Sequence, residues 1–436
     1  MNPTPNKTLF ERFFHSQTTG SLVLLLATIT AVVWANSPWS NLYHTLSHLD
    51  IGTHFNGKQY HLSLDHWVKD GLMAIFFFVV GLEIKREILI GELSSVKKAM
   101  LPVMAALGGA VIPALIYFAF NPSGPAASGW GVPMATDIAF ALGLLALFGK
   151  RVPIGLKVFL TALAIVDDLM AVLVIALFYT DQIGIVALVA AVFLLALLAL
   201  IVRNNIHRPV CTFLLIVGVW LCVFLSGIHA TIAGVLLAMI VPVKATIEPK
   251  EFFNTLKQHK AWLKESKISR RSMVADKQQR LAILQIYRAA EKMIPLGIHL
   301  EDHLHPIQAF LILPLFALFA AGVTVDGNTL AAFPGTVSLG IIAGLLIGKQ
   351  VGIIGFSFLV IKSGLTELPT GVNWGQLWGV SLLGGIGFTM SIFISELAFT
   401  DEAMIADAKI AIFIASILAG IGGFLVLQRT LPKKKR

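Results

Sequence analysis

The sequence has few charged residues and few cysteines for its length. Only 13% of its 436 residues are charged, about half of the share found in soluble domains, which excludes a soluble enzyme and a disordered chain. Cys211 and Cys222 stand eleven positions apart, roughly 16 Å along a helix, which is too far for a disulfide. A disulfide-rich secreted domain is therefore also excluded, and the cysteines say nothing about the redox compartment.

Hydrophobic residues make up 56% of the chain, and its mean hydropathy is +0.82. They gather in twelve apolar runs, and spans of about 20 residues would use about 240 positions of the chain. The runs lie at about 19–37, 66–83, 98–119, 130–149, 153–179, 184–202, 209–225, 227–243, 306–325, 335–361, 376–398 and 405–428. The sequence predicts an all-α polytopic membrane protein with residues 1–430 in one transmembrane domain. The first run is interpreted as a retained span, with a signal peptide as the alternative.

The basic residues predict the orientation in the membrane. An even number of spans puts both termini on one side. If that side is the cytoplasm, nearly all of the 33 Lys and Arg residues lie inside, and the outer loops hold only Lys58 and Lys69. The formal charge of +9 then reflects the orientation of the protein in the membrane, and anionic lipid attracts the basic residues on the cytoplasmic side. It does not indicate a nucleic-acid partner.

Residues 45–64, on the outer side, are predicted to form a β-hairpin. Asn56-Gly57 is the preferred pair for a tight type I′ turn, and the flanking residues loosely alternate between apolar and polar. A lone hairpin is marginally stable in water, and its exposed edge could pair with the same edge of a second subunit. A bare loop is the alternative interpretation.

Residues 244–305 are predicted to form a long basic loop on the cytoplasmic side. Residues 277–293 have the pattern of an amphipathic helix, which is expected to lie on the basic inner surface or against other loops. The segment contains no enzymatic motif.

Four charged residues fall inside predicted spans, where each costs about 2.5–3.5 kcal/mol on insertion scales. They are Asp137, Asp167, Asp168 and Lys349. A structural ion pair between Lys349 and one Asp would account for two of them, but not for three acids. Neighbouring residues on a helix point about 100° apart. Either Asp167 or Asp168 can therefore face Lys349 while the other faces a cavity.

Excess carboxyl groups at this depth predict a site that exchanges a cation for a proton. Burial disfavours the charged form of a carboxyl group, so it can hold either a proton or a hard cation. Hard cations prefer oxygen ligands, and the hydroxyl group of Thr136 is next to Asp137.

Two of the spans are predicted to be broken helices. Span 130–149 opens with Gly131 and Pro133, and span 376–398 contains a glycine-rich run at 384–387. Close helix packing is the alternative explanation of these glycines. Broken helices are tolerated at mid-membrane only where they line a cavity. Their positions favour two inverted repeats, at 98–179 and 335–428.

Five stretches of the sequence resemble the NhaA-type sodium/proton antiporters. The matching stretches are 80–87 (VGLEIKRE), 135–143 (ATDIAFALG), 162–169 (ALAIVDDL), 226–231 (SGIHAT) and 384–391 (GGIGFTMS). The resemblance runs from about residue 20 to 430, apart from an insert at 244–298. This family is itself one of the known examples of inverted repeats.

The resemblance implies twelve spans, two crossing broken helices, and a homodimer joined through the hairpin in a bacterial inner membrane. It implies electrogenic, pH-regulated exchange of cytoplasmic Na⁺, and also Li⁺, for more than one external H⁺, without a cofactor. Asp168 would be the main cation and proton ligand. Asp167 would be its partner and would pair with Lys349 when no cation is bound. Asp137, with Thr136 beside it, would compensate the helix ends at the crossing.

The resemblance also implies a pH response in regions of the inner face. The residues concerned are Glu83, Glu87, His229, Glu301 and His305. Histidine can titrate near neutral pH, although each of these residues could equally be a solvated loop charge. This chain departs from the family pattern here, because it has Asp302 where family members carry His and because its preceding loop is much longer.

Two other functions compete with antiport. A sodium-coupled symporter for an organic solute would need a larger polar pocket at the midplane, and the sequence has no further polar cluster to supply it. An intramembrane aspartyl protease could pair Asp137 with Asp168, since paired acids can activate water. That site would have no use for Lys349, and the expected Gly-Asp contexts are missing.

Overall fold

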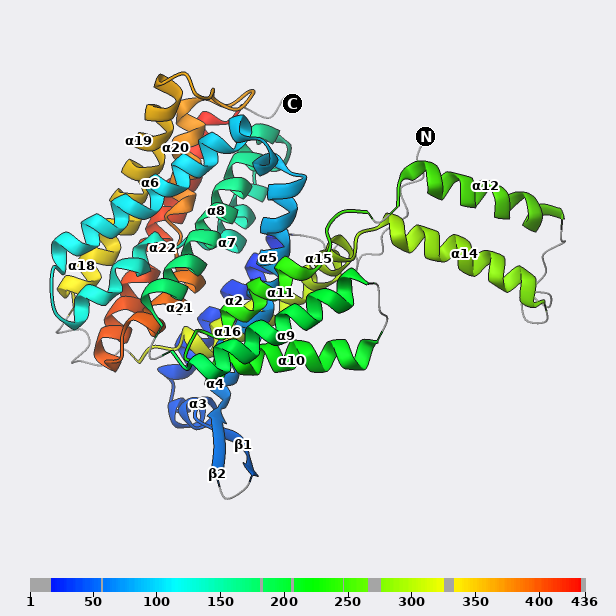
Figure 1. Ribbon diagram of the computed structural model, residues 1–436. Helices are drawn as coiled ribbons and strands as arrows, with labels where there is room; N and C mark the ends of the chain where they lie inside the picture. Colours follow the sequence, from blue (N-terminus) through cyan, green and yellow to red (C-terminus); the bar gives the residue numbers. More distant parts are fainter. Residues whose placement is uncertain are drawn as a thin grey trace.

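The computed structural model of the chain describes residues 17–55, 58–180, 183–204, 208–245, 247–265, 276–324 and 333–432. Helices form one large bundle, with a small β-ribbon at one end and a pair of helices standing out at the side (Figure 1). The ribbon joins the first two long helices, and the protruding pair belongs to the insert predicted from the sequence.

Within these described ranges, eight helical stretches are long and apolar enough to cross a membrane, and a ninth is a pair bent by 44°. The eight are α2 (Gln17–Ala35), α6 (Val96–Phe120), η3 with α7 (Pro125–Met134 and Ile138–Ala146), α8 (Ile154–Phe178), α9 (Ile185–Arg203), α15 with η5 and α16 (Leu296–Ile307, Gln308–Ile312 and Leu313–Ala320), α18 with η6 and α19 (Thr336–Ala343, Gly344–Gly348 and Lys349–Lys362) and α22 (Glu402–Thr430). The bent pair is α20 (Trp374–Gly384) with α21 (Phe388–Ala398). The chain is therefore a helical, multi-span membrane protein.

The other three expected spans are helical but shorter. They are α5 (Met73–Leu89) and α10 (Pro209–Leu225), with 17 residues each, and α11 (Thr231–Ile240), with 10. The π-helical turn η1 (Trp67–Leu72) leads directly into α5. The number of twelve crossings stays a prediction.

Two groups of helices share the order helix, broken helix, helix. The first comprises α6, η3 with α7, and α8, and the second comprises α18 with α19, α20 with α21, and α22. Helices α6 and α19 lie against each other through glycines. A Cβ atom on Gly352 would lie 2.0 Å from the carbonyl oxygen of Gly108, and one on Gly348 would lie 2.7 Å from the Cα of Pro113. This close approach of two backbones needs small residues spaced by four, as in other membrane helix pairs.

Both breaks follow from the local sequence. Helix α20 begins with a capping box of Asn373 and Gln376 and ends in the glycine-rich run, and α21 starts again at Phe388. On the other side, the 3₁₀ segment η3 contains Pro133, and helix α7 starts at the N-cap residue Asp137. Glycine and proline disfavour a continuous helix at both breaks. After the break that contains Pro133, the side chain of Asp137 caps the start of α7.

The remaining helices form a second layer beside these two groups. Helix α5 packs on α11, and a Cβ atom on Gly234 would lie 2.1 Å from the carbonyl oxygen of Ala74. Helix α2 packs on α16 and α7, while α9, α10 and α11 share a smaller apolar cluster of their own. Short 3₁₀ turns, η2 (Glu92–Ser94) and η4 (Gly149–Arg151), connect neighbouring helices.

The ribbon at the end of the bundle contains strands β1 (Asp50–Phe55) and β2 (Lys58–Ser63). They pair antiparallel, with Asp50 opposite Ser63 and Phe55 opposite Lys58. Helix α3 (Ser40–Ser47) precedes the strands, and α4 (Leu64–His66) follows them. The predicted turn residues Asn56 and Gly57 lie outside the described residues.

The insert forms a helical hairpin that we call the insert hairpin, made of α12 (Pro249–Glu265) and α14 (Lys277–Met293). The two helices pack against each other and run in opposite directions (Figure 1). The predicted amphipathic helix at 277–293 is present as α14, and its immediate partner is another part of the same loop. The carboxylate of Asp276 starts this helix by accepting from the backbone N–H of Gln278.

Candidate cation and proton site

The four charged residues expected inside the membrane lie together where the two helix breaks meet. They are Asp137, Asp167, Asp168 and Lys349, and each is at most 2% exposed. Asp137 comes from the break before α7, the two neighbouring acids come from the middle of α8, and Lys349 comes from the first residue of α19. Three chain segments that are distant in sequence therefore converge on one buried cluster, which we call the crossing cluster.

Asp137 holds the two helix breaks together. Its Oδ1 accepts from the backbone N–H of Phe140 at 3.1 Å, and its Oδ2 accepts from the backbone N–H of Thr389 at 3.1 Å and from the hydroxyl of Thr389. Its own backbone N–H donates to the carbonyl of Ile386 at 2.7 Å. The carboxylate thus lies at the N-termini of α7 and α21, where the helix dipoles favour negative charge.

Asp167 is paired with Lys349, and Thr136 joins the pair. The ammonium group of Lys349 contacts Asp167 Oδ2 and donates to the Thr136 hydroxyl oxygen at 2.9 Å. That hydroxyl lies 2.6 Å from Asp167 Oδ2 and 2.8 Å from the carbonyl oxygen of Gly384. A hydroxyl group has one proton, so it can donate to only one of these acceptors at a time.

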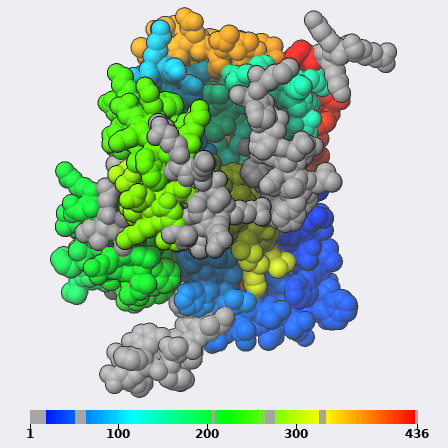
Figure 2. Space-filling view, turned by 90° about the vertical axis from the view of Figure 1, so that its right-hand side faces the viewer, coloured from blue at the N-terminus to red at the C-terminus, as the bar shows by residue number. Residues whose placement is uncertain are grey.

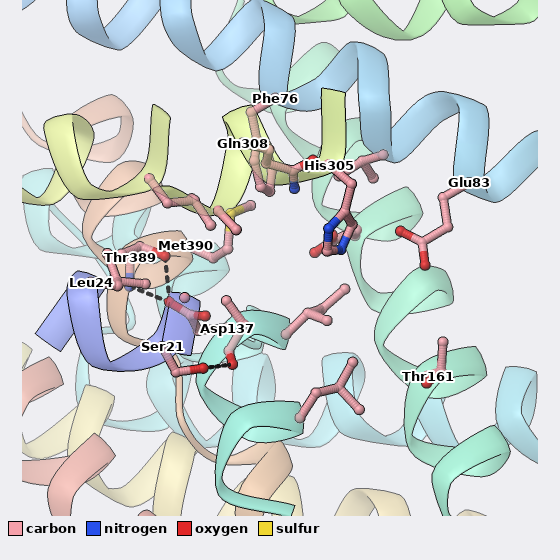
Figure 3. A pocket seen from close by; sticks show the side chains of 18 residues that line it. Ser21, Leu24, Phe76, Glu83, Asp137, Thr161, His305, Gln308, Thr389 and Met390 are labelled. Atoms are coloured by element: carbon pink, nitrogen blue, oxygen red, sulfur yellow. Dashed lines mark hydrogen bonds between the residues drawn. The ribbon is translucent and has the colours of Figure 1, made fainter. Parts of the chain in front are cut away.

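Asp168 faces a cavity. The cavity has a volume of about 140 Å³ and lies between α2, α5, α7, α8, α21 and the continuous stretch α15, η5 and α16 (Figure 3). Its polar lining residues are Ser21, Glu83, Asp137, Thr161, Asp168, His305, Gln308 and Thr389. Among the described residues, none forms a hydrogen bond with Asp168 Oδ2. The two neighbouring acids are thus directed differently, as their 100° separation predicts.

The cavity offers the ligands that a hard cation prefers. Carboxylate, hydroxyl and amide oxygens converge on it, and most of the remaining lining is apolar. Ser21 is held in place by donating from its hydroxyl to the carbonyl of Ala139 at 2.6 Å (Figure 3). A buried carboxylate oxygen without a hydrogen bond is costly, so the site favours either a proton or a cation on it.

Four of the five residues expected in the pH response lie in one region. Glu83 and His305 line the cavity (Figure 3). One turn further along α5, Arg86 Nε donates to both carboxylate oxygens of Glu301 at 3.1 Å, and Arg86 Nη1 pairs with Glu87 at 2.6 Å. Asp302, where the sequence departs from the family, is exposed.

His229 does not lie with those four residues. Its Nδ1 is 3.7 Å from Asp70 Oδ1, at the start of η1 and α5. That end of the helix is roughly 25 Å from Glu87, at about 1.5 Å per residue. His229 therefore does not share a region with Glu83, Glu87, Glu301 and His305, as the resemblance implied.

An ion-pair chain at the same end was not predicted. Lys69 pairs with Asp65 at 2.7 Å and with Glu396 at 3.0 Å, and Glu396 also pairs with Lys409 at 2.9 Å. We call these four residues the outer ion-pair chain. It connects α4 and η1 to α21 and α22. The sequence contained only a weak signal for it, namely charges near the ends of predicted spans.

Sequence reasoning also missed the partners that complete the crossing cluster. Thr389 donates to Asp137, and the hydroxyl of Ser416 accepts from the backbone N–H of Phe388 at 3.1 Å. Thr389 could have been considered, because it is a hydroxyl residue two positions after the last glycine of the predicted break. Ser416 could not, since it comes from the middle of an uninterrupted helix.

Comparison with known proteins connects this geometry to a family. The family model described as Na⁺/H⁺ antiporter 1 matches residues 11–427. The chain is 45% identical over 429 residues to the Na(+)/H(+) antiporter NhaA 2 of Syntrophotalea carbinolica, covering 98% of this chain and 97% of that protein. It is 45% identical over 424 residues to the Na(+)/H(+) antiporter NhaA of Sulfurimonas denitrificans, covering 97% and 95%. For the NhaA of Oleidesulfovibrio alaskensis the identity is 46% over 420 residues, covering 96% and 93%.

These matches decide between the competing functions. The relatives are named as antiporters, so the interpretation as an aspartyl protease is wrong, and the sodium-coupled symporter has no support. The matches extend over nearly the whole length of both partners. The chain therefore belongs to the Na⁺/H⁺ antiporter 1 family, and it is a membrane transporter rather than an enzyme.

Proposed function

We propose that this protein exports Na⁺, and also Li⁺, from the bacterial cytoplasm in exchange for more than one external H⁺, by alternating access. The proposal places the chain in the inner membrane with twelve spans, two inverted repeats and both termini in the cytoplasm. It also assigns residues 1–430 to one transmembrane domain, the 45–64 ribbon to the outer side, and the 244–305 loop to the cytoplasm.

One observation carries the proposal, and it concerns two adjacent acids. Asp167 is neutralised by Lys349, whereas Asp168 lines the cavity and has no ion-pair partner among the described residues. A structural pair would need only one acid and one base. The additional acid at a cavity wall is a site for a transported ion, because it can hold either a proton or Na⁺.

The transport cycle follows from this arrangement. With the cavity open to the cytoplasm, Asp168 releases its proton and Na⁺ binds to it. Asp167 joins the cation when it leaves Lys349, and Thr136 supplies a hydroxyl oxygen beside it. Asp137 stays bound to both half-helices and compensates their positive ends as they move. On the outer side, protons displace Na⁺ and the protonated site returns.

Two titrating groups make the exchange electrogenic. If one Na⁺ leaves for two protons, each cycle moves one net charge inward, which is favoured by about 2.3 kcal/mol per 100 mV of inside-negative potential. A reversal-potential measurement in proteoliposomes tests this point. We expect the flux to reverse at the ion gradients of a two-for-one exchange, and reversal at a one-for-one gradient would contradict it.

The proposal extends to regulation and assembly. The Glu83, Glu87, Glu301 and His305 region adjoins the cavity and is the candidate for the pH response, and His229 would act separately at the outer end. Strands β1 and β2 provide an edge that a second subunit can extend, which gives a homodimer.

Inside-out vesicles from an antiporter-deficient bacterium test the central proposal. Respiration acidifies them, and Na⁺, Li⁺ or K⁺ is added between pH 6 and 9 while a dye follows the pH gradient. We expect Na⁺ and Li⁺ to release protons from the wild-type protein, and Asp168→Asn to abolish this release. Release by wild type that persists in Asp168→Asn would overturn the assignment of the site.

A further inference from the structure

The insert hairpin takes no part in the exchange cycle described above. It stands clear of the bundle (Figure 1), and it lies toward the viewer in the space-filling view of that side (Figure 2). The two ends of the insert come together at the bundle, where the backbone N–H of Gly297 donates to the carbonyl of Pro242 at 2.9 Å. The hairpin thus joins the bundle between α11 and α15.

Helix α12 presents a row of lysines next to its buried side. Its inward row consists of Phe252, Leu256 and Leu263, and each of these residues is followed by an exposed one. The exposed row consists of Lys250, Phe253, Lys257, Lys260 and Lys264. Spacings of three and four residues put these five side chains on one side of the helix. The phenyl ring of Phe253 is 61% exposed in the middle of four lysines.

Helix α14 has an exposed apolar row, and each of its residues directly follows a buried or partly buried one, as in α12. Its inward row includes Ala282 and Ile286, and the next residues, Ile283 and Tyr287, are 38% and 59% exposed. Ile294, directly after the helix, is 56% exposed and continues the row. Leu281 and Leu284, on the other side of α14, are each 46% exposed, so what distinguishes this row is its position on the side of the α12 lysines.

The two rows lie on the same side of the insert hairpin. In each helix the exposed row is one residue, or about 100°, after the inward row. Two antiparallel helices that pack side by side are related by a twofold axis perpendicular to the plane that contains both helix axes. On each helix, a rotation of about 100° away from the partner-facing side therefore leads to the same face of the hairpin. Glu251 lies on the opposite side of α12, at its first turn. We call this combined surface the basic-apolar face.

We propose that the basic-apolar face binds the anionic phospholipid surface of the inner leaflet. The lysine ammonium groups would contact phosphate groups, while Phe253, Ile283 and Ile294 enter the interface between headgroups and acyl chains. Lysine stems can lie along apolar surface while their charges remain in water. An apolar row beside four lysines fits this layered environment, whereas a purely acidic protein partner would leave the apolar row exposed to water.

The attachment of the hairpin favours lipid as the partner. Its two connections lead directly into α11 and α15, so lipid headgroups are always within reach at a high effective concentration. The inference rests on the proposed orientation, in which this side of the protein is cytoplasmic. It adds a peripheral membrane contact that the transport mechanism does not require.

Fluorescence of the full-length protein in nanodiscs tests the inference. Cys211→Ser and Cys222→Ser remove the native thiols, and an environment-sensitive dye is attached at Ile283→Cys. The matched control carries the dye at Gln285→Cys, on the opposite side of α14. The discs contain phosphatidylcholine alone or with one-quarter phosphatidylglycerol, and lipid-attached quenchers report contact with the bilayer.

We expect the dye at 283 to shift to the blue and to be quenched at least threefold more in anionic discs than in neutral ones. About 0.5 M salt should reverse most of this, because exposed charges are then screened. The dye at 285 should change little. Replacing Lys250, Lys257, Lys260 and Lys264 with Gln should abolish the effect at 283 and leave Na⁺/H⁺ exchange intact.

Equal quenching at 283 in neutral and anionic discs would overturn the inference, and so would equal quenching at 283 and 285. Protection of the dye at 283 in detergent, without any lipid dependence, would instead indicate a protein partner and would also overturn it. Each of these results can occur in a protein that exchanges Na⁺ for H⁺ normally. Failure of the lipid inference is therefore distinguishable from failure of the proposed function.

Discussion

The crossing cluster and the outer ion-pair chain differ in how their buried acidic and basic residues are balanced. The outer chain alternates in sign, because two acids, Asp65 and Glu396, pair with two bases, Lys69 and Lys409. The crossing cluster has three acids and one base, and within the described part of the chain only Asp167 of these acids pairs with that base. A balanced set can hold helices together, whereas an unbalanced one needs a mobile counter-charge.

The two groups of charged residues also differ in exposure and in their place in the bundle. Glu396 and Lys409 are 8% and 10% exposed, and their chain lies at the end of the bundle near the ribbon. The members of the crossing cluster are at most 2% exposed and meet at two broken helices. The first set is thus more accessible to the surrounding water, whereas the second is reached only through the cavity that Asp168 lines. Substitutions in the outer chain should therefore change stability, and substitutions in the crossing cluster should change transport.

The largest expected effect comes from Asp168→Asn compared with Glu396→Gln. Asparagine keeps the shape of the side chain but cannot carry the charge that alternates between H⁺ and Na⁺. We expect proton release from inside-out vesicles to fall to the background of vesicles without the protein. Glu396→Gln should retain at least half of the wild-type release. Loss of release in both variants would show that the two regions do not differ in function.

The next largest effect concerns the helix contact that positions Lys349. A Cβ atom at Gly352 would lie 2.0 Å from a backbone oxygen of α6, so Gly352→Ala must push α6 and α19 apart. We expect a loss of about 3 kcal/mol or more in the free energy of unfolding, the upper part of the range for overpacking. Gly355→Ala, on the same helix and with no atom within 4 Å of its Cβ position, is the matched control.

Thermal unfolding in detergent measures this pair of variants. Gly355→Ala should unfold at the wild-type temperature or slightly above it, because alanine favours helix more than glycine does. If both variants unfold alike, the backbone contact between α6 and α19 is not what holds Lys349 in place.

A smaller loss of stability is expected when the outer ion-pair chain is cut at its centre. Glu396→Gln removes an acid that pairs with two lysines, and we expect it to cost about 1–3 kcal/mol. Asp65→Asn removes only one end of the chain, which is more accessible to water than Glu396, and should cost about 0–1 kcal/mol. The midpoints of thermal unfolding give the order, and an equal cost for both variants would argue against a connected chain.

Thr136 allows the crossing cluster to be tested one hydrogen bond at a time. Thr136→Val removes the hydroxyl that contacts Lys349, Asp167 and Gly384 but keeps the shape of the side chain. Since one hydrogen bond contributes about 0.5–1.5 kcal/mol, the Na⁺ concentration for half-maximal exchange should rise roughly threefold to tenfold. Thr136→Ser keeps the hydroxyl and should stay within about twofold of wild type. A serine variant as impaired as valine would exclude the hydroxyl as the cause.

The smallest effect on transport is expected from Glu301, which lies beside Arg86, one turn of α5 beyond the cavity. Glu301→Gln removes a negative charge that pairs with Arg86. With less negative charge nearby, the transporting acids lose their protons more readily, so the pH of half-maximal activity should move down by less than about one unit. Asp302→Asn, at the adjacent exposed position, is the control and should not move it. A shift to higher pH in Glu301→Gln would contradict this electrostatic argument.

Much of the architecture could be predicted because membrane insertion imposes simple rules. Apolar runs predicted where the helices lie, and charges inside those runs marked Asp137, Asp167, Asp168 and Lys349 as functional residues. The glycine-rich run and Pro133 predicted the breaks, since both residue types interrupt helices. These features depend on neighbouring residues only, and so they can be recognised in a linear sequence.

Other parts of the site could not be predicted because they depend on which helices become neighbours. The sequence allowed either adjacent acid to face Lys349, and the rotation of α8 in the bundle selected Asp167. His229 was expected together with the four residues near Glu83, yet it lies 3.7 Å from Asp70, far from them along α5. The partners Thr389 and Ser416 reach the crossing from helices far along the chain.

The sequence by itself determined that this protein is a helical, multi-span membrane protein, where its helices break, and which charges remain at mid-membrane. Hydrophobicity and backbone propensity act locally, and both can be read along the chain. Only the tertiary structure decided which acid is neutralised by Lys349 and which one faces the cavity. That choice depends on the packing and rotation of whole helices, which are set by contacts such as the one between Gly108 and Gly352.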